Sequence, residues 1–202
     1  MKIENLDDKQ KDALKELGNI GAAHAATALS QMIGQTIEMS VPKVTFVRKA
    51  QIEKSKKFND IPGISIYMDM YGKINGKILI FFEYKNAMTL TEILLRKDLG
   101  TIHKISEVEE SALKEVGNIL ASSYLNAISQ VVDGILLPSV PHISIDTLAG
   151  VLSYFSIRFK DVVQNALWIE TELRANKTRI SGDFFLFPDE QSLKTIFEMM
   201  KV

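Results

Sequence analysis

The sequence predicts an α+β fold built from two repeated halves with pseudo-two-fold symmetry. When the chain is offset by 99 residues, positions 12–31 match positions 111–130 at eleven of twenty places. Each half begins with a long amphipathic helical pattern and continues into strand-like runs separated by turn residues. This period is too long for a solenoid unit. We therefore expect one domain, residues 1–202, made of two repeats at about 7–99 and 106–202.

The first repeat should open with a helix over residues 7–33. Asp7 and Asp8 can cap its start, and Gly34 can end it. At about 100° per residue, the apolar positions form one stripe: Leu14, Leu17, Gly21, Ala25, Ala28 and Met32. The opposite face carries a polar triplet: Asp12, Glu16 and Asn19. The triplet is therefore predicted to face solvent.

The second repeat should open in the same way, with a helix over about 106–133. Ser106 followed by Glu109 is a capping-box pattern. The expected buried stripe is Leu113, Val116, Leu120, Tyr124, Ala127 and Val131. The far face carries the matching triplet: Ser111, Glu115 and Asn118. Both long helices are thus expected to display polar residues outward.

The rest of each repeat reads as strand, connector, hairpin and helix. Strand-like stretches with internal proline occupy residues 36–47 and 135–145, and proline belongs at strand starts, edges or bulges. Short connectors that we expect to be helical follow each of them. The predicted hairpin strands are 63–71 with 74–84, and 166–174 with 179–187. Amphipathic helices near 86–97 and 189–200 close the repeats.

The predicted order is therefore α-β-α-β-β-α, twice. This order gives a six-stranded, mostly antiparallel sheet with the two long helices on its outside. The hairpins should turn near Gly72-Lys73 and Asn176-Lys177, where residues tolerant of unusual backbone angles stand between the strand patterns.

Composition excludes several functional classes. The net charge of -1 offers no electrostatic footprint for nucleic acid or an anionic membrane. The absence of cysteine excludes disulfides, thiolate metal sites and cysteine nucleophiles. The N-terminus lacks the apolar segment of a signal peptide, and no apolar run approaches the ~18 residues of a membrane span. We therefore expect a cytoplasmic protein without membrane insertion.

The polar triplets extend into a longer repeated motif. Asp12-x3-Glu16-x2-Asn19 is followed after twenty-two residues by Pro42. Ser111-x3-Glu115-x2-Asn118 is followed at the same distance by Pro141. One exposed Glu–Asn pair is usually only a solvated surface. Two copies in register are different, because asparagine is a mediocre helix former that a solvated face does not need twice.

The chemistry available to such a pair is limited. A carboxamide is a poor acid or base, but it can donate to and accept from one water molecule and so orient it. A glutamate can pair with a cation on a partner or accept a proton. No Ser-His-Asp set accompanies the pair. These residues therefore suit a site that another protein completes, with the partner supplying the electrophile and any metal.

Other residues carry weaker signals. Gly18 and Gly21 lack the Lys-Ser/Thr of a phosphate-binding loop and do not follow a strand. Close packing explains such helix glycines best, although Gly18 and its repeat Gly117 could also keep space open for a partner. The three histidines, His24, His103 and His142, show no metal-ligand spacing. No metal site is predicted.

The two motifs and the flanking segments LKELGNIGAAHAATALSQMIG and LKEVGNILASSYLNAISQVV resemble the CheC/CheX/FliY phosphatase family of bacterial and archaeal chemotaxis. The resemblance covers essentially the whole chain. Two intact motifs are typical of the CheC type, whereas the CheX type carries one motif and the FliY type carries additional domains.

This resemblance implies a function. The substrate would be the aspartyl phosphate of the response regulator CheY. Asn19 and Asn118 would orient the attacking water, and Glu16 and Glu115 would dock the regulator. Supporting roles would fall to Asp12, Pro42, Ser111 and Pro141. The chain would need no cofactor of its own, because the regulator holds the Mg²⁺, and the receptor deamidase CheD is an implied second partner.

Two alternatives stay open at this point. A non-enzymatic adaptor could bind phosphorylated CheY or CheD and act by sequestration, although binding alone does not require an amide at both sites. A remnant of a flagellar switch component is less favoured, because we expect no switch-binding modules after residue 202. The regulator, the faster site and the oligomeric state are not determined by the sequence.

Overall fold

The computed structural model describes residues 8–158 and 164–199. The first repeat contains α1 (Asp8–Ile33), β1 (Ile37–Arg48), α2 (Lys49–Glu53), α3 (Lys56–Asn59), β2 (Pro62–Gly72), β3 (Gly76–Glu83) and α4 (Tyr84–Leu94). The second contains α5 (Glu107–Val132), β4 (Leu136–Pro138), β5 (His142–Thr147), α6 (Leu148–Arg158), β6 (Asn165–Ala175), β7 (Thr178–Pro188) and α7 (Glu190–Met199). The predicted order is confirmed, with the first connector divided into two short helices.

The described strands form one seven-stranded sheet in the order β1-β6-β7-β3-β2-β4, and β5 also pairs with β2. Every pairing is antiparallel. The sheet has one strand more than predicted, because the stretch 135–145 is divided. Ser139 bridges the gap: its N–H donates to the Asp69 carbonyl at 2.8 Å, and its hydroxyl accepts from the Asp69 N–H at 2.9 Å.

The strand order has the predicted two-fold pattern. The hairpins of the two repeats meet at the centre, where β3 pairs with β7 and Ile80 lies opposite Phe184. The first strand of each repeat then crosses to the hairpin of the other: β1 pairs with β6, and β4 and β5 pair with β2. Each repeat therefore relies on the other for the edge of its sheet.

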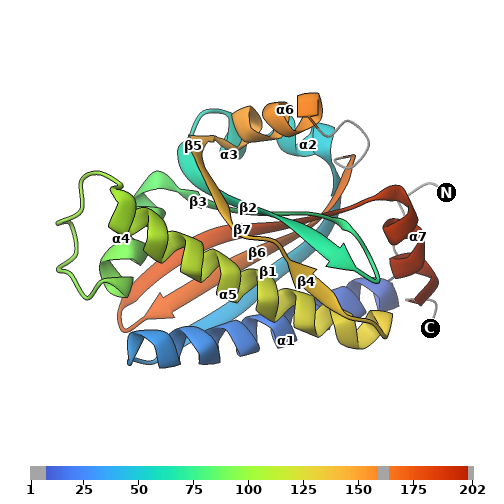
Figure 1. The fold of residues 1–202 in the computed structure, drawn as a ribbon, viewed down its shortest axis with the longest axis horizontal. Helices are drawn as coiled ribbons and strands as arrows, with labels where there is room; N and C mark the ends of the chain where they lie inside the picture. Colours follow the sequence, from blue (N-terminus) through green and yellow to red (C-terminus); the bar gives the residue numbers. More distant parts are fainter. Residues whose placement is uncertain (1–7, 159–163, 200–202) are drawn as a thin grey trace.

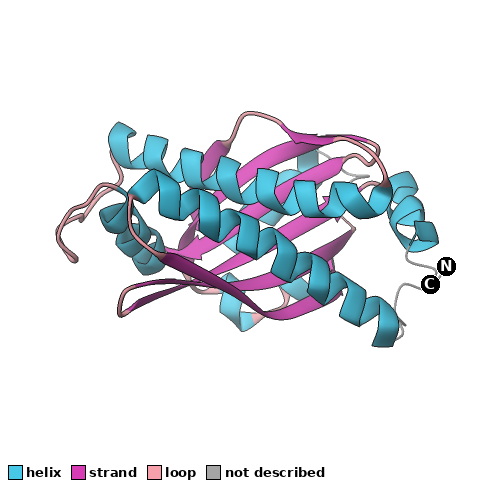
Figure 2. Ribbon diagram, turned by 90° about the horizontal axis from the view of Figure 1, so that it is seen from below, coloured by secondary structure: helices cyan, strands magenta, loops and turns pink. Residues whose placement is uncertain are grey.

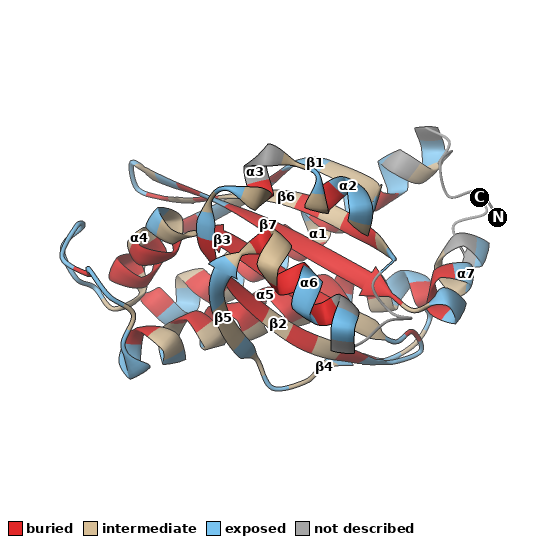
Figure 3. Cartoon of the chain, turned by 90° about the horizontal axis from the view of Figure 1, so that it is seen from above, coloured by how far each residue is buried: buried red, intermediate tan, exposed pale blue. Residues whose placement is uncertain are grey.

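Helices cover both faces of the sheet (Figures 1 and 2). The long helices α1 and α5 lie side by side on one face, and the short helices α2, α3 and α6 lie on the other. A hydrophobic core lies on each face of the sheet, and the central strand β3 contributes alternate side chains to each. Ile78, Ile80 and Phe82 face the long helices, whereas Leu79 and Phe81 face the short ones. This arrangement explains why β3 and the second half of β7 read as nearly continuous apolar runs. Figure 3 shows the buried strands beneath α6.

The predicted buried stripe of each long helix holds except at its last residue. Met32 and Val131 occupy the same repeat position and are 40% and 39% exposed. Their neighbours Ile33 and Val132 are buried instead. The reason is that α1 packs against α5 as well as against the sheet, so the buried sector turns toward the partner helix. The stripe predicted by periodicity alone was wrong at these two places.

The predicted end of α1, the capping box of α5 and the hairpin turns are confirmed. Gly34, which follows α1, has φ 74, and Asn176 in the second hairpin turn has φ 52. Both values lie in the left-handed region that glycine and asparagine tolerate. Ser106 and Glu109 form the expected capping box at the start of α5. Asp7, the other proposed cap of α1, lies outside the described residues. No described helix is long and apolar enough to cross a membrane.

Candidate functional site

The first polar triplet stands on the exposed face of α1. Asp12, Glu16 and Asn19 are all exposed, as the periodicity predicts. Residues three and four apart lie next to one another on a helix surface, so Glu16 and Asn19 form one adjoining pair. We refer to this triplet together with Pro42 as the α1 site.

The second triplet occupies the matching face of α5. Ser111 and Glu115 are exposed, whereas Asn118 is half-buried. The amide of this α5 site, which we define as the triplet with Pro141, therefore sits lower on the surface than that of the α1 site. The two sites share a motif but differ in how far the amide protrudes.

The two sites lie at opposite ends of the helix pair. The colours of Figure 1 show that α1 and α5 run in opposite directions along the sheet. The helices approach each other closely at Gly21, where an added Cβ would lie 2.5 Å from Cδ1 of Tyr124. Since each triplet stands in the N-terminal half of its helix, the sites face separate regions of surface.

The glutamate and asparagine side chains are free to engage a partner. Within the described part of the chain, no hydrogen bond or ion pair involves the side chains of Glu16, Asn19, Glu115 or Asn118. An exposed amide satisfied by solvent can exchange that solvent for a partner's groups at little cost. Both pairs are therefore available rather than committed to the fold.

Glycine seats each site helix on the sheet directly before its asparagine. A Cβ added to Gly18 would lie 3.2 Å from Cγ1 of Val41, and one added to Gly117 would lie 2.5 Å from Cγ2 of Ile66. Both glycines are buried. Of the two sequence-based explanations, close packing is confirmed. The glycines fix the depth at which the helices, and hence the asparagines, are held.

The motif prolines occupy interruptions in the strands that follow the site helices. Pro42 lies within a register shift between Ser40 and Lys43 on β1, which pairs on one side with β6. Pro141 lies in the break between β4 and β5. Proline lacks the N–H needed to continue a ladder, so these are the positions where it fits. Pro42 also follows Val41, the residue that Gly18 contacts.

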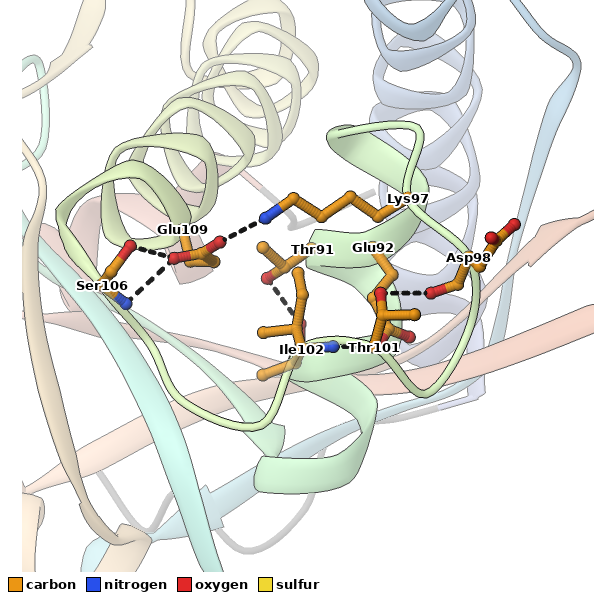
Figure 4. Close-up of polar contacts among 9 residues, drawn as sticks. Thr91, Glu92, Lys97, Asp98, Thr101, Ile102, Ser106 and Glu109 are labelled. Carbon is orange, nitrogen blue, oxygen red and sulfur yellow. Dashed lines mark hydrogen bonds and ion pairs between the residues drawn. The ribbon is translucent and has the colours of Figure 1, made fainter.

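A group of polar contacts fixes the start of α5 (Figure 4). Glu109 accepts hydrogen bonds from the Ser106 hydroxyl and, at 3.0 Å, from the Ser106 N–H, and pairs with the Lys97 ammonium at 2.8 Å. Lys97 first, and then Ser106, hold the pKa of Glu109 at about 2, below its usual value of 4.5. The carboxylate therefore stays ionised and anchors α5 immediately before Ser111.

Glu92 secures the loop that leads into α5. Its carboxylate accepts the Ile102 N–H at 2.8 Å (Figure 4). Burial disfavours the charge, but N–H groups of Ile102, Gly100 and Thr101 outweigh it and lower the pKa of Glu92. Sequence reasoning missed both Glu92 and Lys97. The available signal was a carboxylate within the apolar run 90–95, where a buried charge requires partners.

A hollow of about 560 Å³ adjoins the α5 site. Its lining comes from the end of α1, the end of α4 and the start of α5: Met32, Leu94, Leu95, Glu107, Val108, Ser111, Ala112 and Glu115. Sequence reasoning did not find this α5 groove, because its walls come from three segments that only the fold brings together.

The histidines show no sign of a metal centre. Among the described residues, no group of three or more His, Asp or Glu side chains could hold a metal ion. His24 is exposed on α1, and its repeat counterpart Ser123 is buried on α5. His142 stacks on Tyr67 at 5.4 Å, on a strand that pairs with β2.

Comparison with known proteins identifies similar chains. A profile of the CheC-like family matches residues 10–45 and 108–145, which include both triplets and both motif prolines. The CheY-P phosphatase CheC of Bacillus subtilis is 30% identical over 200 residues, covering 95% of this chain and 94% of that protein.

Solved structures show the same fold at lower identity. The crystal structure of Thermotoga maritima FliY has a TM-score of 0.78 and 18% identity, covering 96% of this chain and 97% of that one. The CheX–CheY–BeF₃–Mg²⁺ complex from Borrelia burgdorferi includes a chain with a TM-score of 0.51 and 17% identity, covering 84% of this chain and 96% of that one.

Proposed function

Because the chain belongs to the CheC-like family, we propose that it is a phosphatase that hydrolyses the aspartyl phosphate of a CheY-type response regulator. The related Bacillus subtilis protein is named for this activity. The observation that carries the proposal for this chain is a Glu–Asn pair on each of two long helices, whose side chains form no hydrogen bond or ion pair within the described residues. The pairs are Glu16 with Asn19 and Glu115 with Asn118.

In this proposal the asparagine amide positions the nucleophile. The carboxamide oxygen accepts one hydrogen of a water molecule, and the amide N–H can donate to the regulator or to the water oxygen. The water oxygen forms a bond to phosphorus while the bond from phosphorus to the aspartyl oxygen breaks. The products are inorganic phosphate, which takes the oxygen and both hydrogens of the water, and the aspartate carboxylate. Asn19 and Asn118 need only hold the water in line.

The glutamate docks the regulator. Glu16 and Glu115 stand one turn before their asparagines, so a cation of the regulator that meets the carboxylate places the amide near the phosphoryl group. Asp12 and Ser111, a further turn back, and the prolines that follow the helices support this arrangement. A rigid helix seated by a buried glycine suits such positioning, because an amide on a mobile loop would not hold a fixed geometry.

The proposal assigns the Mg²⁺ to the regulator. Phosphoryl transfer needs charge neutralisation at the phosphate oxygens, which a bound Mg²⁺ supplies. Mg²⁺ is usually held by one or two carboxylates together with waters and phosphate oxygens, and in this proposal the regulator's own acidic side chains and its phosphate supply those ligands. This chain would therefore add the amide and the carboxylate to a centre whose metal and phosphate its partner already holds.

The positions of the sites support independent action. The α1 site and the α5 site stand toward opposite ends of an antiparallel helix pair (Figure 1), so two regulators could be engaged at once. When one site is disabled, the remaining rate of regulator dephosphorylation should then equal the rate of the intact site.

The test is the decay of phosphorylated regulator with the wild-type chain, Asn19→Ala, Asn118→Ala and the double variant. We expect each single variant to keep the activity of its intact site and the double variant to lose the acceleration. Loss of one preorganised hydrogen-bonding group costs about 10²- to 10³-fold in other enzymes. Asn126→Ala is the matched control, since Asn126 is exposed further along α5. Undiminished acceleration by a folded double variant would refute the proposal.

The same experiment separates an enzyme from an adaptor. Tight binding of the phosphorylated regulator without faster phosphate loss would support sequestration. Association with a CheD deamidase is a further prediction, testable by co-purification of the two chains. A CheY substrate would also place the site of action in the cytoplasm, which fractionation of cells would test.

A further inference from the structure

The α5 groove is an apolar hollow with an acidic rim. Its floor and walls include Met32, Leu95 and Val108. Val108 is 61% exposed and Met32 is 40% exposed, so both present hydrocarbon to solvent. Glu107 and Glu115 are also exposed, and neither pairs with a cation within the described residues. Such an apolar centre with a polar rim is the composition of a protein docking surface.

The groove is continuous with the α5 site. Ser111 and Glu115 belong to the motif and also line the groove. Val108 stands one turn before Ala112, which lines the groove beside them. A partner that brings a cation to Glu115 must therefore cover part of this hollow. Because the groove is continuous with the α5 site, the partner that binds this site is also the expected occupant of the groove.

The duplication supplies an internal comparison. At the 99-residue offset, Val108 corresponds to Lys9, and Met32 corresponds to Val131. Lys9 is exposed, so the α1 site presents an ammonium where the α5 site presents two methyl groups. Ala13 and Ala112 are the same residue at matched positions. The repeats therefore differ in charge at a position beside the motif.

We propose that the α5 groove docks the same regulator whose phosphorylated aspartate is hydrolysed at the α5 site, and that this contact makes the α5 site the tighter of the two. This inference rests on the proposed phosphatase function. The matching surface of the regulator should present an apolar side chain that inserts between Met32 and Val108. A neighbouring cation of the regulator should pair with Glu107 or Glu115. Buried apolar contacts at the centre of an interface dominate affinity, whereas exposed rim charges contribute little.

The experiment exchanges the two repeat residues in proteins with one working site. In the Asn19→Ala background, Val108→Lys should raise the KM for phosphorylated regulator about tenfold with little change in kcat, because it removes an interface contact without touching the reacting atoms. In the Asn118→Ala background, Lys9→Val should lower KM severalfold. Ile157→Lys is the control, since Ile157 is 79% exposed on α6, on the opposite face of the sheet from the groove.

A binding measurement gives a second readout that does not depend on turnover. Calorimetric titration with the regulator loaded with Mg²⁺ and beryllium fluoride should show an about tenfold weaker Kd at the tighter site for Val108→Lys, and an unchanged Kd for Ile157→Lys. An unchanged KM and Kd in folded Val108→Lys would overturn the groove proposal. If the double asparagine variant still loses its acceleration, the phosphatase function survives that result. If the double asparagine variant keeps its acceleration of phosphate loss, the proposed phosphatase function is refuted.

Discussion

Replacement of Gly117 by alanine tests whether the glycine before each asparagine sets the depth of the site helix. The new Cβ would lie 2.5 Å from Cγ2 and 3.3 Å from Cβ of Ile66, which is fully buried on β2. Neither Ile66 nor the α5 backbone can yield without disturbing the core. We therefore expect α5 to lift from the sheet and to carry Asn118 with it.

The magnitude follows from two opposing effects. Alanine in place of glycine favours the helix by about 1 kcal/mol. Overpacking a closed core costs about 1–3 kcal/mol, and a contact this short belongs in the upper half of that range. Gly117→Ala should therefore lower the free energy of unfolding by about 1–2 kcal/mol, the difference between these two effects.

The same substitution in the other repeat is the matched control. A Cβ on Gly18 would meet Cγ1 of Val41 at 3.2 Å and Cγ2 of Val44 at 3.3 Å. Two methyl groups need to move by only a few tenths of an ångström, so the helix gain should offset the cost. Urea unfolding followed by circular dichroism should place Gly18→Ala near the wild type and Gly117→Ala clearly below it. Equal stabilities of the two variants would contradict this account of how α5 is seated.

Two other substitutions test the packing of the fold, one at the start of α5 and one on the opposite face of the sheet. Glu109→Gln removes the carboxylate whose folded-state pKa is about 2 and whose usual value is 4.5. Because a depressed pKa stabilises the fold only while the group is ionised, the variant should be less stable than the wild type above pH ~5. The gap should close as the pH falls from 4.5 toward 2, and a gap that widened on acidification in urea titrations would refute this. Phe58→Ala empties a position that is 0% exposed and packs edge-on against Phe81, Trp168 and Phe185. It should cost about 3–5 kcal/mol of stability in thermal unfolding, and a loss below 1 kcal/mol would show that the site collapses easily.

Much of the fold could be predicted because its signals are local. The helical period of 12–31 and 111–130, the capping box at Ser106, and turn residues such as Asn176 each depend on a few neighbouring residues. The outward orientation of both triplets could be predicted for the same reason. The placement of proline at interruptions of the strands followed from its missing N–H.

Other features could not be predicted because they depend on contacts between distant segments. Met32 and Val131 follow the helical period but are exposed, since the packing of α1 against α5 turns the buried sector. The division of 135–145 depends on Ser139 bonding to Asp69, seventy residues away. The anchoring of α5 by Lys97 and Glu109 likewise depends on how the connecting loop folds.

The sequence by itself determined that this protein is a duplication with two outward-facing amide and carboxylate pairs, because repeat spacing and helical periodicity are properties of one stretch of chain. Only the tertiary structure decided that each repeat completes the sheet of the other and that the helices run antiparallel. It also decided that the ends of α1 and α4 meet the start of α5 to form a groove beside one site. These outcomes arise from packing between elements far apart in the chain, where volume and burial rather than local pattern select the arrangement.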